Sequence, residues 1–474
     1  MLKTYNSVLD QESKNHPGQA EPDLVRKLSL FSTTNIVIAN MIGAGIFTTS
    51  GLLIKEIGHP ILLMVLWVAG GLIALCGALC YGVLASAMPR AGGEYVFLSR
   101  LFHPIFGFLS GWVSFLVGFS APIAASAIGV SEYLARSFPQ IVDTGHSSLS
   151  EWMVKKSIAI AIVITFTLLH SLGIELSAKV QNGLTILKVG IILALLILGF
   201  TLGSGDFGRF SSGKTFEFDF AGWKTICLSL MWIMFAYSGW NAAAYIGSEV
   251  KNPQRNLPLS LILATGLVTL LYLALNALFI FSIPLQEMSG VISVGGLAAG
   301  KLFGLVAEKV VSLIIAFALF SSLSAFIILG PRVYYAMARD GYFLRWAAEV
   351  HPRFLVPVKS IFIQGLVGII FILSGTFDQI LTYMGFALGI FPLLAVGGVF
   401  KLYHQPQLKI HLKRIGFPVI PLCYMIAGLM ILILGFMQRP VPSSIAILTV
   451  IAGIPVYLIL ARKRGRSQVK LNYN

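Results

Sequence analysis

The sequence predicts an all-α protein that crosses a membrane many times. Its 474 residues are 57% hydrophobic and only 11% charged, and the mean hydropathy is +0.85, values far from those of a soluble domain. Apolar segments recur along the chain, each near the roughly 20 residues that a helix needs to cross a bilayer. Two of them are interrupted by small and polar residues. Together these observations predict a polytopic membrane protein with two broken helices.

Twelve spans are predicted in order. They cover about 28–54, 60–88, 104–134, 153–173, 180–203, 222–249, 258–284, 304–337, 358–374, 378–402, 415–437 and 440–461. The tails 1–27 and 462–474 are polar. No apolar core precedes a cleavage site in the N-terminal tail, so no cleavable signal peptide is expected there.

The spans divide into two halves of five with two spans left over. Residues 28–203 hold spans one to five, 204–402 hold spans six to ten, and 403–461 hold the last two. An odd number of spans per half inserts the second half upside down relative to the first. This is the inverted-repeat plan of many secondary transporters.

The two interruptions occupy matching places in the halves. The first is IGAGIF (42–47), and the second lies in FAYSGWNAAAYIGSEVKNPQRNLP (235–258). In hydrocarbon, a helix break survives only where its freed backbone groups face protein or a water-filled cavity. Small residues also occur where helices pack closely. A matched pair of breaks favours a transporter's binding site.

Broken helices supply complementary ends for a zwitterion. The half-helix after the first break begins with unpaired N–H groups, which suit a carboxylate, and the half-helix before the second break ends in free carbonyls, which suit an ammonium. The predicted ligand is an amino acid held by residues of both breaks: Ile42, Gly43, Ala44, Gly45 and Ile46 in the first, and Phe235, Ala236, Tyr237, Ser238, Gly239 and Asn241 in the second. Asn241 is equally compatible with a hydrogen bond between helices.

Basic residues predict the orientation. With the N-terminus inside, the cytoplasmic segments hold 23 of the 34 lysines and arginines, the other face holds ten, and Lys188 lies inside a span. Because cytoplasmic loops collect such residues, both termini are predicted to be cytoplasmic. The net charge of +15 is thereby a topology signal, and nucleic acid is excluded as a partner.

Four motifs resemble those of the amino acid-polyamine-organocation (APC) superfamily of transporters. They are IGAGIF, MPRAGGEYVFLSRLFHPIFGFLSGW (88–112), GPRVYYAMARDGYF (330–343) and the 235–258 motif, which is close to the sixth-helix pattern of the L-type amino acid transporter branch and its bacterial relatives. The resemblance implies a substrate held between unwound first and sixth helices, with Phe235 as an outer lid. An aromatic residue in a span also serves packing.

Lys188 is the most informative single charge. An ionisable residue inside a span is costly and usually functional, although a lysine also reaches the surface or a lipid phosphate through its long stem. In sodium-independent members of the family, a fifth-span lysine takes the place of a bound sodium ion. The resemblance implies that Lys188 bridges the first break to hydroxyls of the eighth span, with Ser321, Ser322 and Ser324 as partners to choose from.

The expected substrates are neutral L-amino acids. Glu132, Glu175, Glu249 and Asp378 fall at span ends or in loops, so no carboxylate is expected at mid-membrane to receive a cationic side chain. The resemblance favours exchange of one amino acid for another, and proton-coupled symport remains open. An amino acid-binding membrane sensor is the alternative from another class.

Neither a cofactor nor a metal site is predicted. The eight histidines are scattered without metal-ligand spacing, and no nucleophile or phosphate-loop motif indicates an enzyme. Animal L-type members are linked to a partner glycoprotein through a cysteine between spans three and four, and 135–156 contains none. We therefore expect no disulfide-linked heavy chain, and a prokaryotic-type permease of the inner (plasma) membrane.

Overall fold

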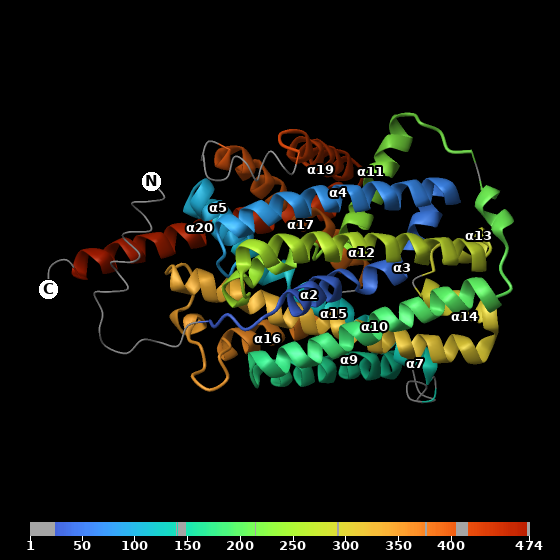
Figure 1. The fold of residues 1–474 in the computed structure, drawn as a ribbon, viewed down its shortest axis with the longest axis horizontal. Helices are drawn as coiled ribbons and strands as arrows, with labels where there is room; N and C mark the ends of the chain where they lie inside the picture. The colour runs from blue at the N-terminus through green and yellow to red at the C-terminus, as the bar shows by residue number, and fades with distance from the viewer. Residues whose placement is uncertain are drawn as a thin grey trace.

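The protein is a bundle of long helices that run side by side (Figure 1). The computed structural model describes residues 24–138, 140, 148–213, 215–291, 293–374, 377–403 and 416–471. The described start of the chain and the far end of α20 lie on the same side of the bundle (Figure 1). Most of the two predicted tails, 1–27 and 462–474, lies outside the residues whose side chains are described.

The described part of the chain begins with a capped helix. The hydroxyl of Ser29 accepts from the N–H of Ser32 at 3.2 Å, an N-cap that satisfies one orphan donor of the first turn. The elements that follow in the described residues are α2 (Leu30–Met41), α3 (Ala44–Ile57), α4 (Pro60–Ala87), α5 (Glu94–Leu101), α6 (Pro104–Val113), the π-helical turn η1 (Ser114–Gly118), α7 (Ser120–Ser137), α9 (Ser148–Ser171), α10 (Ile174–Leu202) and η2 (Phe207–Ser211).

The helix after η2 is capped by Asp219, whose carboxylate accepts from the N–H of Gly222 at 2.7 Å. The described elements from there to the end of α20 are α11 (Phe220–Ala236), η3 (Ala242–Tyr245), η4 (Gly247–Glu249), α12 (Pro253–Ser282), α13 (Leu285–Met288), α14 (Val294–Phe303), α15 (Leu305–Arg339), η5 (Arg345–Ala348), α16 (Val358–Ser374), α17 (Phe377–Leu402), α19 (Val419–Gln438) and α20 (Pro440–Leu471).

Ten helices within the described residues are long and apolar enough to cross a membrane. They are Leu30–Ile57, Pro60–Ala87, Pro104–Ala135, Glu151–Ser171, Glu175–Leu202, Pro253–Ser282, Leu305–Arg339, Met384–Leu402, Val419–Gln438 and Pro440–Arg462. Predicted spans six and nine correspond to shorter apolar helices, Phe220–Ala236 and Val358–Leu373. The all-helical membrane fold is therefore confirmed, whereas the count of twelve spans and the inverted repeat stay predictions.

Predicted span three differs from the structure in its interior, whereas span six breaks where the sequence predicts it. Span three is interrupted at η1, where the N–H of Phe119 donates to the carbonyl of Ser114 at 3.1 Å. Pro122 explains this turn, because it has no N–H to pair with the carbonyl four residues earlier. Span six (222–249) is α-helical only to Ala236 and continues as short 3-10 turns.

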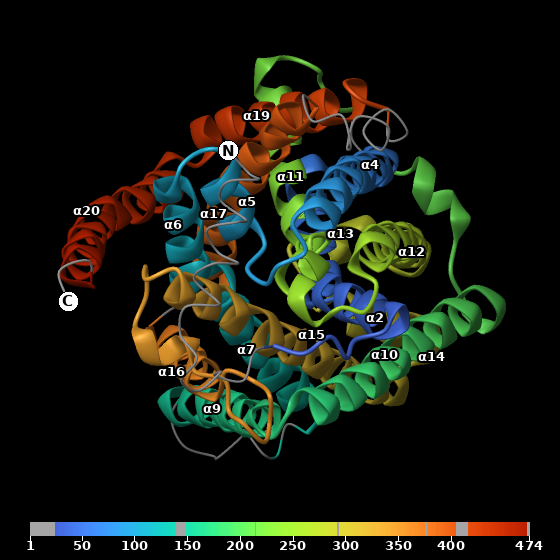
Figure 2. The same cartoon turned by 60° about the vertical axis from the view of Figure 1, so that its left-hand side comes forward.

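Two groups of helices pack side by side within the bundle. Helices α2, α4, α11 and α12 pack together, while α7, α9, α10, α15 and α16 form a second group, as Figure 2 shows. Two isolated β-bridges join loops at one end of the bundle: Leu28 pairs with Val250, and Ala91 pairs with Ile246. The segment after the second break is therefore tied to the start of α2 and to the loop before α5.

Candidate substrate site

The two helix breaks meet in the interior. Helix α2 ends at Met41 and α3 begins at Ala44, and no side chain caps the start of α3, so the N–H groups of its first turn are left without a side-chain partner. A Cβ at Gly45 would lie only 2.7 Å from Cα of Ala236 at the end of α11. Glycine at position 45 is what allows the start of α3 to lie against the end of α11.

The second break begins where α11 stops. The N–H of Ser238 donates to the carbonyl of Phe235 at 2.9 Å. Gly239 then adopts φ +99°, a conformation that favours glycine. A Cβ there would lie 2.3 Å from Nδ2 of Asn40. Both the backbone angle and the contact with α2 therefore require glycine at this position.

Tyr272 of α12 joins the two breaks, a role that sequence alone does not reveal. Its hydroxyl lies 2.6 Å from the carbonyl oxygen of Met41 and 2.9 Å from that of Ala236. These carbonyls stand at the last residues of α2 and α11, where helices leave acceptors unpaired. One buried hydroxyl thus serves both helix ends. Neither the hydropathy nor a motif marks a tyrosine in span seven for this position.

Lys188 reaches the first break, as the sequence predicts. It is fully buried, and its Nζ donates to the carbonyl of Ala39 at 3.1 Å and to that of Ile42. A free cation would find the same kind of oxygen ligands here. The amino group of Lys188 therefore occupies the carbonyl end of α2.

The three serines of α15 have different partners. Ser321 accepts from Nε2 of Gln181 at 3.1 Å, while the hydroxyl of Ser324 donates to Oε1 of Gln181 and lies 2.8 Å from Nε2 of His170. Ser322 faces Gly43, where an added Cβ would lie 2.8 Å from its Oγ, and that Oγ has no hydrogen-bond partner in the described structure. Among them, Ser322 is the one beside the first break.

A small cavity of about 110 Å³ lies beside the second break. Four predicted site residues line it: Phe235, Ser238, Gly239 and Asn241. The remaining predicted residues do not line this cavity, namely Ile42, Gly43, Ala44, Gly45, Ile46, Ala236 and Tyr237. The hydroxyl of Tyr237 instead donates to the carbonyl of Trp67 at 3.2 Å, and the substrate role of these seven stays a prediction.

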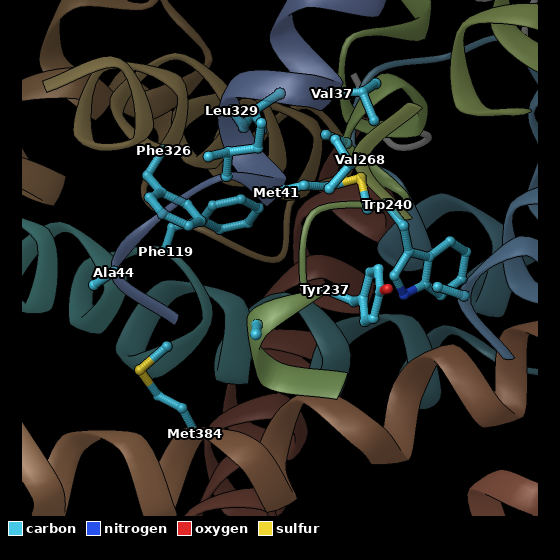
Figure 3. Close-up of a cluster of buried hydrophobic side chains, with 14 of the residues drawn as sticks. Val37, Met41, Ala44, Phe119, Tyr237, Trp240, Val268, Phe326, Leu329 and Met384 are labelled. Atoms are coloured by element: carbon cyan, nitrogen blue, oxygen red, sulfur yellow. The ribbon is translucent and has the colours of Figure 1, made fainter. Parts of the chain in front are cut away.

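The wall of the cavity is largely apolar. Phe119, between η1 and α7, and Phe326 of α15 are far apart in the sequence but lie next to each other at the cavity (Figure 3). The same view shows Trp240 near the second break. The centroid of the Trp240 ring lies 4.7 Å from that of the Tyr81 ring, so Trp240 packs against α4. Further apolar lining comes from Ile73, Val113, Met231, Met234, Phe391, Leu393, Ile431 and Leu432.

Several polar lining residues escape the sequence prediction, among them Asn40 and Glu94. Asn40 is 4% exposed, and its Oδ1 has no hydrogen-bond partner within the described residues. Glu94, at the first position of α5, is 2% exposed. Both side chains face the cavity. The expectation that no carboxylate lies at mid-membrane considered only Glu132, Glu175, Glu249 and Asp378. Glu94 adds a buried carboxyl at the cavity wall: it stands outside the predicted spans, so hydropathy gave no sign of its burial.

Glu94 is held by neutral groups. Its Oε1 accepts from the Tyr81 hydroxyl at 2.7 Å and from Nδ2 of Asn241 at 2.6 Å. Nδ2 of Asn241 also lies 3.2 Å from the Tyr245 hydroxyl. Burial raises the pKa of the Glu94 carboxyl, and hydrogen bonds from Tyr245, Tyr81 and Asn241 partly offset that rise. The predicted polar role of Asn241 is thus a bond to Glu94 at the cavity wall.

Glu249, which the sequence places at a span end, is buried and has a charged partner. Arg332 of α15 forms a bidentate pair with it, Nε to Oε1 at 2.8 Å and a terminal guanidinium nitrogen to Oε2 at 3.0 Å. Both side chains are nearly inaccessible to solvent. Lys251 and Arg255 are exposed, because the chain turns outward after Val250.

Comparisons with known proteins agree with this geometry. A family model described as amino acid permease matches residues 28–465. The chain belongs to the amino acid permease family. The resemblance to the APC superfamily and its L-type branch is thereby confirmed, and the protein is an integral membrane transporter of amino acids by family.

Relatives of this amino acid permease cover nearly the whole chain. It is 25% identical over 463 residues to the large neutral amino acids transporter small subunit 2 of Mus musculus, covering 94% of this chain and 85% of the relative. It is 26% identical to the cystine/glutamate transporter of Homo sapiens, covering 94% and 87%. The b(0,+)-type amino acid transporter 1 of Mus musculus is 26% identical, covering 95% and 91%.

Proposed function

We propose that this permease moves neutral L-amino acids across the plasma membrane independently of sodium, by exchange through alternating access. The observation that carries the proposal is the contact between Lys188 and the carbonyls of Ala39 and Ile42. An ammonium held at that helix end takes the place that a sodium ion would need, because two cations at the same carbonyls would repel each other.

The shape and lining of the cavity support a small, neutral amino acid. At about 110 Å³ the cavity is well below the roughly 300 Å³ and more of pockets for drug-sized ligands. Its lining includes no lysine or arginine that would pair with an acidic side chain. The unpartnered Oδ1 of Asn40, which lines the cavity, offers an acceptor for the substrate's ammonium.

The molecule's setting is part of the same proposal. We place both termini in the cytoplasm and the protein in the inner membrane of a prokaryotic-type cell, with twelve spans and the five-plus-five repeat. The loop 135–156 contains no cysteine. This supports a permease that works without a disulfide-linked heavy chain.

Uptake of labelled amino acids into proteoliposomes tests the substrate and the ion. With unlabelled alanine inside, we expect uptake of labelled alanine or leucine to be equal in sodium and in choline buffers. We expect lysine, arginine and glutamate to compete poorly. A requirement for sodium would contradict the role of Lys188, and preference for a charged amino acid would contradict the substrate class.

Proton-coupled symport is the second mode to consider, because one observation favours it. Glu94 is a buried carboxyl at the cavity wall, and no ion pair with it is present among the described residues. A protonatable group beside the substrate is what coupling to protons requires. Uptake into vesicles without internal amino acid, driven by an imposed proton gradient, would establish this mode.

A further inference from the structure

We propose that Glu94 is a proton-binding site of the substrate cavity, which takes up a proton when a neutral amino acid binds and returns it when the amino acid leaves. This inference rests on the proposed transport of neutral amino acids and adds a second ligand, the proton, to that site. The balance is simple: one proton adds to a carboxylate oxygen on binding and departs to water on release.

The partners of Glu94 accommodate both protonation states. A tyrosine hydroxyl donates to a carboxylate but also accepts from a carboxylic acid, and two such hydroxyls, those of Tyr81 and Tyr245, stand at Glu94. A lysine or arginine partner would fix the charged form. The cluster of Glu94 with Tyr81, Asn241 and Tyr245 therefore lets the proton come and go without leaving a buried group unsatisfied.

The surrounding charges do not compensate Glu94. The titratable groups near its carboxyl are Tyr81 of α4, Tyr245 of η3 and Tyr424 of α19. Helices α15 and α17 also pack on α5, and their charged groups there engage other residues. Asp340 accepts from the Tyr95 hydroxyl at 2.7 Å, and Lys401 donates to the carbonyl of Leu101 at 2.7 Å.

Substrate binding makes the charged form of Glu94 still less favourable. A neutral amino acid that enters the cavity displaces water from its wall, and a buried carboxylate without a counter-charge is costly in a dry site. Binding and protonation then assist each other through linkage. Asn241 carries the effect to the second helix break, because its Nδ2 donates to Glu94 while the residue itself lines the cavity.

The sign of the pH dependence follows directly. Burial raises the pKa of Glu94 in the free protein, and a bound neutral substrate raises it further. Affinity is therefore constant at low pH, where Glu94 is already protonated, and falls as the pH rises above the pKa of the free protein. The dissociation constant rises by up to about tenfold per pH unit in that range. A cationic substrate would show the reverse, because it would prefer the carboxylate.

Binding of labelled alanine to the purified full-length protein, measured across acidic to mildly alkaline pH, tests the proposal. We expect the wild type to lose affinity as the pH rises and Glu94→Gln to bind independently of pH, with the affinity that the wild type has at low pH. Glu132→Gln is the matched control, because Glu132 is half-exposed and pairs with Lys155, and it should follow the wild type. Tyr81→Phe should shift the wild-type curve to higher pH, because one donor to the carboxylate is lost.

A measurement on the wild type keeps the proposal falsifiable if Glu94→Gln does not fold. In weakly buffered solution with a pH indicator, alanine binding should consume up to one proton per alanine in the pH range where the affinity falls. Binding without proton uptake, or a pH slope retained by Glu94→Gln, would overturn the proton site. Preference for arginine or lysine that Glu94→Gln abolishes would overturn it in favour of a counter-charge for cationic substrates. If the wild type binds no amino acid at all, the proposed function fails first.

Discussion

Lys188 is held by backbone oxygens, and it forms no ion pair within the part of the chain that the structure describes. Its ammonium pairs with carbonyls of Ala39 and Ile42, so removal of the charge leaves two buried acceptors unsatisfied. Each such group costs about 1 to 3 kcal/mol. We expect Lys188→Met, which keeps the length of the side chain, to reduce exchange at least about tenfold and to gain nothing from sodium, as measured by uptake into proteoliposomes.

Lys401 offers a matched control for that substitution. Its Nζ also donates to a carbonyl at the end of a helix, that of Leu101 in α5, but it lies away from both breaks. Lys401→Met should therefore leave exchange close to the wild-type rate. Equal losses in the two variants would contradict a special role for Lys188, and so would full activity of Lys188→Met.

Tyr272 makes a second prediction at the scale of single residues. Tyr272→Phe removes the hydroxyl that serves the carbonyls of Met41 and Ala236. We expect a lower melting temperature, consistent with a loss of about 1 to 3 kcal/mol, together with slower exchange. Tyr237→Phe is the comparison, because its hydroxyl bonds a single carbonyl within α4 at 3.2 Å. A smaller effect of Tyr272→Phe than of Tyr237→Phe would contradict the bridging role.

The close approach of α3 and α11 depends on one missing methyl group. An added Cβ at Gly45 would stand 2.7 Å from Cα of Ala236, and backbone cannot move aside as a side chain can. We expect Gly45→Ala to cost about 1 to 3 kcal/mol by overpacking and to abolish exchange. Gly190→Ala in α10 meets nothing within 4 Å and should leave exchange unchanged, with a slightly higher melting temperature.

On the scale of helices, the sequence predicts this protein well where long apolar runs, and the small residues that interrupt them, mark the helices and their breaks. Both breaks, at 42–43 and after Ala236, stand where small residues interrupt apolar runs. The lone charge in a span marks Lys188 as functional, but its contact with the first break was implied only by the resemblance to the family. The turn at η1 was not predicted, because Pro122 lies inside a segment of membrane-spanning length.

Residues that act through tertiary contacts were beyond sequence reasoning. Glu94 is polar, follows two glycines and lies between spans, so its pattern is that of a surface turn, yet it is 2% exposed. Asn40 and Tyr272 belong to apolar spans in which nothing local marks them. Their roles arise from helices far apart in the chain that meet only in the fold.

On the scale of the whole molecule, the Glu249–Arg332 pair ties the segment after the second break to α15. Both side chains are buried, and loss of one member of a buried pair costs about 3 to 5 kcal/mol because the other charge is left alone. We expect Glu249→Gln and Arg332→Gln each to lower the melting temperature strongly. The double variant should recover part of the loss. Additive losses in the double variant would show that the two residues act independently.

The proposed exchange is best tested with labelled alanine in proteoliposomes, with and without unlabelled alanine inside and with no ion gradient. With a single site between the two breaks and Lys188 in place of sodium, we expect rapid uptake only into vesicles loaded with alanine, equally in sodium and in choline. Absence of uptake into loaded vesicles, or uptake that depends on sodium, would contradict it.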